Sequence, residues 1–180
     1  GFGTAGSGKV FYWDDVTLLP TNQAGLVLPL DFQSSTLNYT FTNFDGGNTT
    51  VINNPFVTGI NTSTKVAKMV KGPGGQAWGG SWIALDAPIN FTSNIMRMKV
   101  YSPRVGAKVL LKLENFANGN LNYEREVLTT VANGWEDLSF DFSGRNTSNT
   151  YQRVVVIFDN GTVGDGSANY TFYFDDIRVN

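Results

Sequence analysis

Short runs of β-branched and aromatic residues recur along the whole chain, and clusters of Gly, Asn, Pro and Ser separate them. No window of helical length repeats its apolar residues with the 3.6-residue period of an amphipathic helix. Several runs instead alternate apolar and polar residues, as strands with one buried face do. The pattern predicts an all-β fold, and 180 residues are enough to bury one well-packed core.

Four runs alternate clearly enough to show which side of each strand is dry. The residues expected in the core are Ile83 and Leu85; Met96, Met98 and Val100; Val109, Leu111 and Leu113; and Leu138, Phe140 and Phe142. Residues 153–158 are apolar on both sides, which is typical of a central strand. The segment 45–48 predicts a hairpin turn between two further runs. Together these runs predict a two-sheet antiparallel β-sandwich with jelly-roll connections, with a closed barrel as the alternative.

The last strand of the chain has a counterpart near its beginning. Residues 172–179 contain three aromatic residues followed by two Asp, residues 11–18 contain nearly the same series, and a similar glycine-rich segment precedes each. The match predicts that residues 1–19 are the C-terminal tail of a preceding similar module, residues 20–25 a linker and residues 26–180 a complete module. Convergence on a common turn-and-strand pattern is the alternative.

Composition and charge exclude several classes of function. The formal net charge is -2 and the basic residues are dispersed, so nucleic acid is not an expected partner. The chain has no His and no Cys, which excludes His- or Cys-based nucleophiles, zinc sites and disulfide scaffolds. No stretch approaches the roughly 20 consecutive apolar residues of a membrane span. An enzyme built from this chain would have to work with carboxylates, Lys or Tyr.

A carboxylate in the closing strand suggests a metal ion. Alternation places Asp175 on the same side as Tyr173 and Ile177, which predicts that its carboxylate is buried. Ca²⁺ would be a suitable partner, because it takes about six to eight oxygen ligands. Asp31 and the side-chain oxygen of Gln33 would supply further ligands if the first and last strands meet. Hydrogen bonds from backbone N–H groups, or an ion pair with Lys or Arg, are the alternative.

A set of aromatic and polar residues is expected to share one wet surface. Sugars present flat C–H faces edged by hydroxyls, so a site for them combines aromatic platforms with planar bidentate groups and amine or amide donors. The candidate carbohydrate-binding residues are Trp78, Trp82, Arg97, Tyr101, Lys112, Glu114, Asn118 and Tyr123. For any single one of them, burial beneath a loop or an ordinary solvated ion pair is equally compatible with the sequence. Trp135 follows a turn and is expected in the core.

Paired carboxylates are a catalytic arrangement that this composition leaves open. Glu124 and Glu126 lie two residues apart, about 6 to 7 Å along one face of a strand, a separation that a glycosidase can use. Nothing in the surrounding sequence suggests the apolar pocket that raises the pKa of a catalytic acid. We therefore expect no catalytic residues.

Several runs, taken in their order along the chain, resemble the calcium-bearing β-sandwich carbohydrate-binding modules of secreted bacterial polysaccharide-degrading enzymes, including endo-β-glucanases. The resemblance covers about residues 26–179. The runs that carry it are residues 30–33, 100–103, 111–114, 134–142 and 172–177. It implies a galactose-binding-like jelly roll and a structural calcium ion between the first and last strands. Asp175 matches the last-strand ligand, whereas Gln33 stands where a Glu is usual.

The same resemblance implies a glycan groove either on a concave sheet face or at the loop tips. Trp82, Lys112 and Glu114 would serve the face, and Trp78 would serve the loops. We therefore expect a non-catalytic module that binds a β-linked polysaccharide, such as the β-glucans laminarin or cellulose. It would be secreted or on a bacterial cell surface, beside similar modules or a catalytic domain in the same chain. A structural or adhesive repeat without glycan binding is the main alternative, and a small glycoside hydrolase or lyase is the third.

Overall fold

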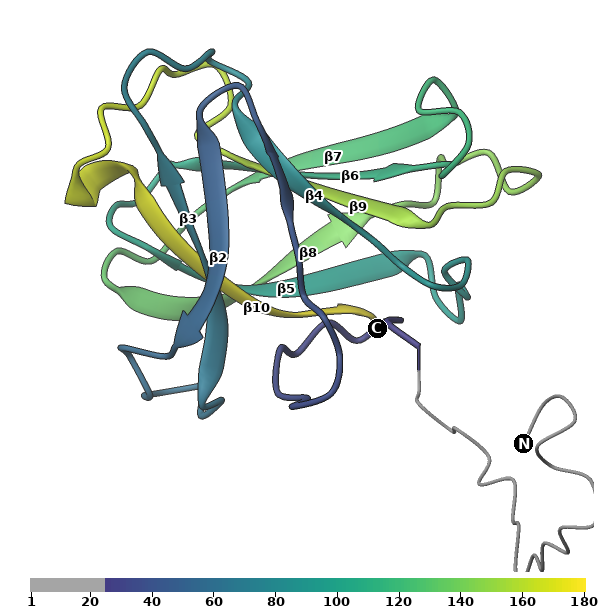
Figure 1. Ribbon diagram of the computed structural model, residues 1–180, viewed down its shortest axis with the longest axis horizontal. Helices are drawn as coiled ribbons and strands as arrows, with labels where there is room; N and C mark the ends of the chain where they lie inside the picture. Colours follow the sequence, from purple (N-terminus) through teal and green to yellow (C-terminus); the bar gives the residue numbers. More distant parts are fainter. Residues whose placement is uncertain (1–24) are drawn as a thin grey trace, which may run out of the picture.

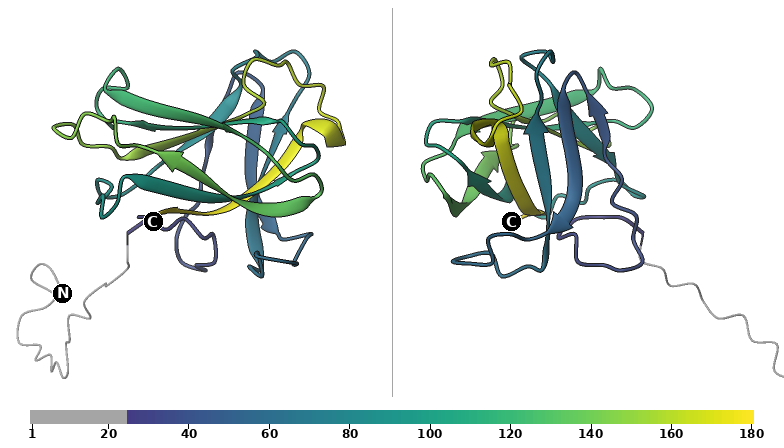
Figure 2. Two further views of the ribbon diagram at one scale, coloured as in Figure 1. Left: turned by 180° about the vertical axis from the view of Figure 1, so that it is seen from behind. Right: turned by 60° about the vertical axis from the view of Figure 1, so that its left-hand side comes forward.

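Two antiparallel five-stranded sheets pack face to face in the computed structural model, which describes residues 25–180 (Figure 1). Sheet I has the strand order β1-β4-β9-β6-β7, and sheet II has the order β2-β3-β10-β5-β8. Figure 2 shows the same two layers from two further sides. The predicted all-β sandwich is confirmed, whereas the predicted tail and nearly all of the predicted linker lie outside the described residues.

The strands are short and follow the runs seen in the sequence. Their bounds are β1 Thr42–Phe44, β2 Gly47–Asn53, β3 Lys65–Lys71, β4 Gly80–Ala84, β5 Ile95–Ser102, β6 Lys108–Glu114, β7 Asn122–Leu128, β8 Gly134–Asp141, β9 Arg153–Phe158 and β10 Thr171–Val179. A 3₁₀ helix, η2 at Ala168–Tyr170, precedes β10. The described residues contain no helix that is long and apolar enough to cross a membrane.

The core lies between the sheets and takes the residues that alternation assigned to it. All of the expected core residues of β5, β6 and β8 are buried, and the ring of Phe174 in β10 packs at the centre. Its neighbours are the rings of Phe32, Phe41 and Phe158. A strand period of two is therefore enough to predict which side of these strands is dry.

The turn between β1 and β2 connects the two sheets. The hairpin predicted there is wrong, because β1 pairs with β4 in sheet I whereas β2 pairs with β3 in sheet II. Asp45 and Gly46 have φ angles of 50° and 91°, which turn the chain from one sheet to the other. A Cβ atom on Gly47 would lie 2.4 Å from the backbone of Gly80, so the two segments approach too closely for a side chain there.

The beginning and the end of the described chain meet at one edge. Leu30 and Ile177 form an isolated antiparallel bridge, with N–O distances of 2.9 and 3.1 Å between their backbones, and Figure 1 shows the C-terminus beside this segment. A bulge shifts the register of β10 between Asp175 and Arg178. Ile177 therefore points into the core, whereas Asp175 lies on the outer side of sheet II, contrary to the simple alternation.

The loop of residues 54–64 covers this outer side of sheet II. The ring of Phe56 stacks on Tyr101 with centroids 4.0 Å apart, and the indole N–H of Trp135 donates to the Phe56 carbonyl oxygen at 2.8 Å. Val66, Tyr101 and Trp135 form a second small core under the loop. The expected burial of Trp135 is confirmed, although it lies outside the main core.

A buried lysine ties two loops together at one end of the sandwich. Lys71, at the end of β3, is 1% exposed, and burial lowers its pKa. Its ammonium donates to the carbonyl oxygens of Ala77 at 2.8 Å, Asp159 at 3.1 Å and Thr162 at 2.6 Å. The ammonium group thereby fixes the loop that carries Trp78 against the loop that follows β9.

Lys71→Met should lower the free energy of unfolding by about 2 to 4 kcal/mol, because three carbonyl groups lose a charged donor in a buried place. Urea denaturation followed by circular dichroism measures the change. Lys68→Met, on the same strand but half exposed, is the matched control and should cost less than about 1 kcal/mol. Equal costs for the two substitutions would contradict the role of the Lys71 ammonium.

Candidate functional site

The outer face of sheet I combines an apolar base with charged side chains. Strand register places Trp82 of β4, Val155 of β9, Lys112 of β6 and Glu124 of β7 in one row across the sheet. The apolar base consists of Leu110, Val155 and Ile157, with Phe44 and Trp82 packed against it. Sheet I thus offers an aromatic side chain next to hydrogen-bonding groups, as a sugar site requires.

Arg153 links these groups into one cluster. Its guanidinium carbon lies 4.3 Å from the centroid of the Trp82 ring, within the range of a cation–π contact. Its Nη1 donates to Glu114 Oε2 at 3.0 Å, while the Lys112 ammonium lies 3.1 Å from Glu114 Oε1. Glu114 therefore holds both cations in place beside the indole ring.

An exposed phenylalanine borders this cluster. Phe116 is 54% exposed, and its ring centroid lies 5.7 Å from the guanidinium carbon of Arg153. Arg153 Nη2 also donates to the Phe116 carbonyl oxygen at 3.3 Å. The Asn115 side chain fixes the start of the loop, because it donates to Thr150 and accepts from the next backbone N–H groups. Three flat groups, those of Trp82, Arg153 and Phe116, are thus held close together.

A pocket of about 560 Å³ lies beside Trp82. It exists because β1 pairs with β4 only from Gly80 to Trp82, which leaves the rest of the β4 edge without a partner strand. Thr36, Asn38 and Thr40 line the pocket together with Trp82. Residues with hydroxyl and amide groups therefore border, together with an aromatic residue, a hollow of a size suited to small sugars.

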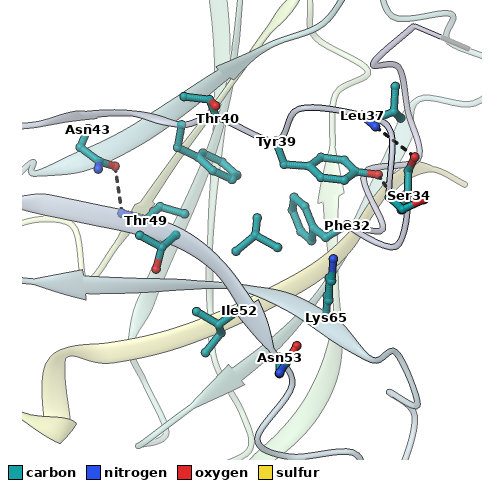
Figure 3. A pocket seen from close by; sticks show the side chains of 14 residues that line it. Phe32, Ser34, Leu37, Tyr39, Thr40, Asn43, Thr49, Ile52, Asn53 and Lys65 are labelled. Atoms are coloured by element: carbon teal, nitrogen blue, oxygen red, sulfur yellow. Dashed lines mark hydrogen bonds between the residues drawn. The ribbon is translucent and has the colours of Figure 1, made fainter. Parts of the chain in front are cut away.

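A larger groove of about 820 Å³ lies between the edges of the two sheets, on the other side of residues 34–40 (Figure 3). The rings of Phe32 and Tyr39 line one end, and the Thr49 N–H donates to Asn43 Oδ1 at 2.9 Å at the other end. None of the sequence-predicted site residues lines this groove.

Three of the predicted binding residues, Trp82, Lys112 and Glu114, share the outer face of sheet I. The expectation that Arg97 and Tyr101 belong to the same surface is wrong, because β5 lies in sheet II. Tyr101 is 9% exposed beneath Phe56, and Arg97 pairs with Asp137 at 3.0 Å on that other sheet. Alternation shows which side of a strand is wet, but it does not show to which sheet the strand belongs.

The other predicted residues lie apart from the cluster or only border it. Trp78 is 54% exposed at a loop end, where its indole N–H donates to Asp45 Oδ2 at 2.9 Å. Asn118 is exposed in the loop next to Phe116. The expectation for Tyr123 is wrong, because its ring turns inward against Phe142, with centroids 5.7 Å apart.

Sequence reasoning missed Arg153; it singled out the loop of residues 115–120, which contains Phe116, only as a wall beside the binding face. Arg153 begins a run that otherwise contains only apolar residues, so the run predicts a central strand that is covered on both faces. The available signal was its charge: a charged side chain in an otherwise apolar strand is expected to project from the outer face of the sheet. Phe116 lies in an Asn-rich loop, where a large aromatic residue has no core to fill.

The residues expected to bind calcium lie near one another but are largely engaged with the protein itself. The Asp31 carboxylate accepts from the Gln33 N–H at 3.1 Å, and the Gln33 amide makes five hydrogen bonds. Burial raises the pKa of Tyr39, and the charges of Asp31 and Asp175 contribute to that rise. The described residues contain no group of three or more Asp or Glu side chains that could hold a metal. The calcium hypothesis stays a prediction.

Asp175 is the exception among these residues. It is completely buried; one oxygen accepts from the Asp176 N–H at 2.8 Å, whereas Oδ2 has no hydrogen-bond partner among the described residues. Desolvation raises its pKa to about 6, although the nearby Ser63 and Asn61 side chains and the Asp176 N–H act in the opposite direction. This carboxyl therefore binds a proton more tightly in the folded chain than in the unfolded chain.

No protein-family model and no curated protein matches this sequence. Solved structures do match its fold. The fold is that of β-sandwich carbohydrate-binding modules. One similar structure comes from a study of the promiscuous specificity of such modules, with a TM-score of 0.57 and 14% identity over 86% of this chain and 62% of that chain. The present chain thus spans less than two thirds of that structure.

Two further structures are similar at the same level. A family 11 carbohydrate-binding module from Clostridium thermocellum, in complex with a β-1,3-1,4-mixed-linked tetrasaccharide, has a TM-score of 0.52 and 13% identity over 82% of this chain and 90% of that chain. An exo-β-agarase has a TM-score of 0.61 and 13% identity over 83% of this chain, but only 24% of its own chain is covered. At these identities the similarity establishes the fold alone.

The pH dependence of unfolding should reveal the buried Asp175. The folded pKa is raised, so the stabilisation by its proton is complete below about pH 4 and is lost as the pH rises through about 6. The rise from 3.8 to about 6 corresponds to a loss of about 3 kcal/mol in the free energy of unfolding. Denaturant titrations between pH 4 and 7 measure it.

Asp175→Asn is the reference for that experiment, because it keeps an acceptor for the Asp176 N–H and cannot ionise. The wild-type chain should lose stability relative to this variant as the pH rises. If the wild-type chain instead became more stable than the variant as the pH rises, the expectation would be contradicted. That result would mean that a cation neutralises the Asp175 carboxylate.

Proposed function

We propose that this chain is a non-catalytic carbohydrate-binding module that binds a β-linked polysaccharide on the outer face of sheet I. The observation that carries the proposal is the cluster in which Arg153 joins the Trp82 ring to Glu114, with exposed Phe116 at its border. The fold that the chain shares with solved carbohydrate-binding modules supports the proposal.

The cluster can bind a sugar ring through its flat groups and its polar rim. Phe116 and the uncovered part of Trp82 provide apolar surface for the C–H face of a sugar. Lys112 can donate to sugar hydroxyl groups and Glu114 can accept from them. Because Glu114 already holds Lys112 and Arg153, binding immobilises few additional side chains, which lowers its entropic cost.

The pocket beside Trp82 would extend this site along the polymer. Asn38 and Thr40 line it and can reach the edge of a sugar unit next to the one on the cluster. A chain of sugars would then cross the β4 edge, with one unit on the outer face and one in the pocket. Such a two-part site binds a polymer better than a single sugar.

The charges of this face favour a neutral ligand. Lys108, Lys112 and Arg153 each lie within 3.4 Å of a carboxylate oxygen of Glu126 or Glu114. An acidic polysaccharide would have to compete with these carboxylates, whereas a neutral glycan only exchanges hydrogen bonds. A β-glucan such as laminarin, cellulose or a mixed-linked glucan fits this requirement, and the similar module from Clostridium thermocellum was solved with a mixed-linked tetrasaccharide.

The biological setting forms part of the same proposal. A module of this kind would be secreted or surface-bound in a bacterium, and it would keep an attached catalytic domain near its substrate. The repeated closing pattern at residues 11–18 supports tandem modules, whose combined binding would exceed that of one module.

A structural or adhesive repeat without a glycan site is the second candidate. One observation favours it: the guanidinium of Arg153 already covers part of the Trp82 ring.

Glu124 and Glu126, the carboxylates of the hydrolase alternative, lie on the exposed side of β7, and Glu126 pairs with Lys108 at 3.4 Å. Reducing-end release from β-glucan that Glu124→Gln or Glu126→Gln abolishes would support an enzyme instead.

Affinity electrophoresis tests the proposed function. Mixed-linked β-glucan, laminarin or soluble cellulose derivatives without charge should retard the chain, whereas pectate and alginate should not. Retardation should change little between 50 and 500 mM NaCl, because the ligand is neutral. A chain that migrates equally in every polysaccharide gel would favour the structural repeat.

Trp82→Ala should weaken β-glucan binding about tenfold or more, because it removes the main aromatic surface of the cluster. Isothermal titration with a soluble oligosaccharide measures the dissociation constant, and the thermal midpoint of each variant checks the fold. Trp78→Ala, which removes an exposed indole at the loop end, is the matched control and should leave binding within about twofold. The reverse result would place the site at the loop tips.

A further inference from the structure

The side-chain amide of Gln33 joins two segments that are distant in the sequence. Its oxygen Oε1 accepts from the Thr64 N–H at 3.1 Å, from Thr64 Oγ1 at 2.7 Å and from the Lys65 N–H at 3.3 Å. Its nitrogen Nε2 donates to the carbonyl oxygens of Asp31 at 2.5 Å and Lys65 at 2.8 Å. All of the polar capacity of the amide is therefore used within the protein.

These partners fix the orientation of the amide. If the amide were rotated by half a turn, its NH₂ group would face two backbone N–H donors and its oxygen would face two carbonyl oxygens. The observed orientation satisfies five hydrogen bonds, and the rotated one would lose all but the contact with the Thr64 hydroxyl. The NH₂ group thus lies between two carbonyl oxygens.

Carbonyl oxygens that converge from different segments are typical ligands of Ca²⁺. Here the carbonyl oxygens of Asp31 and Lys65 converge on a nitrogen that carries hydrogen atoms instead. Gln33 Oε1, the ligand expected from the sequence, could reach a cation only by giving up three donors. The Asp31 carboxylate, which accepts from the Gln33 N–H, and the Asp175 carboxylate are the expected ligands that remain, and they supply fewer oxygens than the six to eight that Ca²⁺ typically takes.

We propose that the Gln33 amide takes the place of a calcium ion in this chain, so that the segment of residues 30–33 is tied to β3 by hydrogen bonds and the fold is independent of calcium. This differs from the calcium site that the sequence led us to expect at Asp31, Gln33 and Asp175. The proposal does not depend on glycan binding, because its readout is the stability of the chain.

Thermal unfolding of the metal-stripped wild-type chain tests the proposal directly. The midpoint should be the same, within about 1 °C, in 5 mM CaCl₂ and in 5 mM EDTA. A midpoint that rises by about 5 °C or more with CaCl₂, or saturable Ca²⁺ binding in isothermal titration, would overturn the proposal.

Gln33→Glu tests the same idea by gain of function. The new carboxylate places an oxygen against the carbonyl groups of Asp31 and Lys65, and at neutral pH a bound cation relieves that repulsion. The variant should unfold at a lower temperature than wild type in EDTA, and CaCl₂ should raise its midpoint by about 5 to 10 °C. Gln76→Glu, which adds the same charge on an exposed loop, should show no such response.

Two further outcomes decide the case. A Gln33→Glu chain that is unfolded in EDTA and folds in CaCl₂ would support the exchange of amide and ion, whereas a chain that calcium does not stabilise would overturn it.

Gln33→Met keeps the length of the side chain but loses the five hydrogen bonds. It should be destabilised without rescue by CaCl₂, and a rescue would show that calcium reaches the site without Gln33.

Discussion

The packing of the 54–64 loop against sheet II decides which surface of the sandwich remains available for binding. Phe56 stacks on Tyr101, and its carbonyl oxygen accepts from the Trp135 indole, so the aromatic side chains on the outer face of that sheet belong to a second core. The corresponding side chains of sheet I, Trp82 and Phe44, pack against Leu110, Val155 and Ile157, and Arg153 covers part of the Trp82 ring. The outer faces of the two sheets therefore differ in that the 54–64 loop covers the aromatic side chains of sheet II.

On sheet I, the ion pairs organise the site as much as the aromatic rings do. Exposed ion pairs contribute little to stability, and those of Glu114 with Lys112 and Arg153 are only partly exposed. Their main consequence is geometric, because they hold a planar guanidinium against the Trp82 ring and next to Phe116. A face with its charges balanced in this way suits a neutral polymer.

Much of the fold could be predicted from the sequence, because strand alternation directly reflects which side of a strand is dry. The buried sides of β5, β6 and β8 follow from it. Alternation carries no information about which sheet a strand joins, so it does not distinguish the surface of Tyr101 and Arg97 from that of Trp82, nor the turn at Asp45 from a hairpin. These features depend on pairing between distant strands, which a local pattern does not encode.

The site could be predicted only in part, for a similar reason. Trp82, Lys112 and Glu114 can be predicted because they alternate with core residues in β4 and β6. Arg153 stands at the start of an apolar run, and the bulge in β10 turns Ile177 to the core side while Asp175 lies on the outer side of the sheet. The role of Gln33 depends on five hydrogen bonds to residues up to 32 positions away, which only the folded chain brings together.

The central claim is that a neutral β-glycan binds on the outer face of sheet I. The most direct test is a nuclear magnetic resonance titration of the isotope-labelled chain with a mixed-linked β-glucan oligosaccharide, with the tryptophan indole and arginine side-chain signals followed separately. The account predicts that the signals of Trp82, Arg153 and the Phe116 loop shift together and saturate, while those of Trp78 and Trp135 stay in place. Shifts confined to Trp78, or no shift with any neutral glycan, would contradict it.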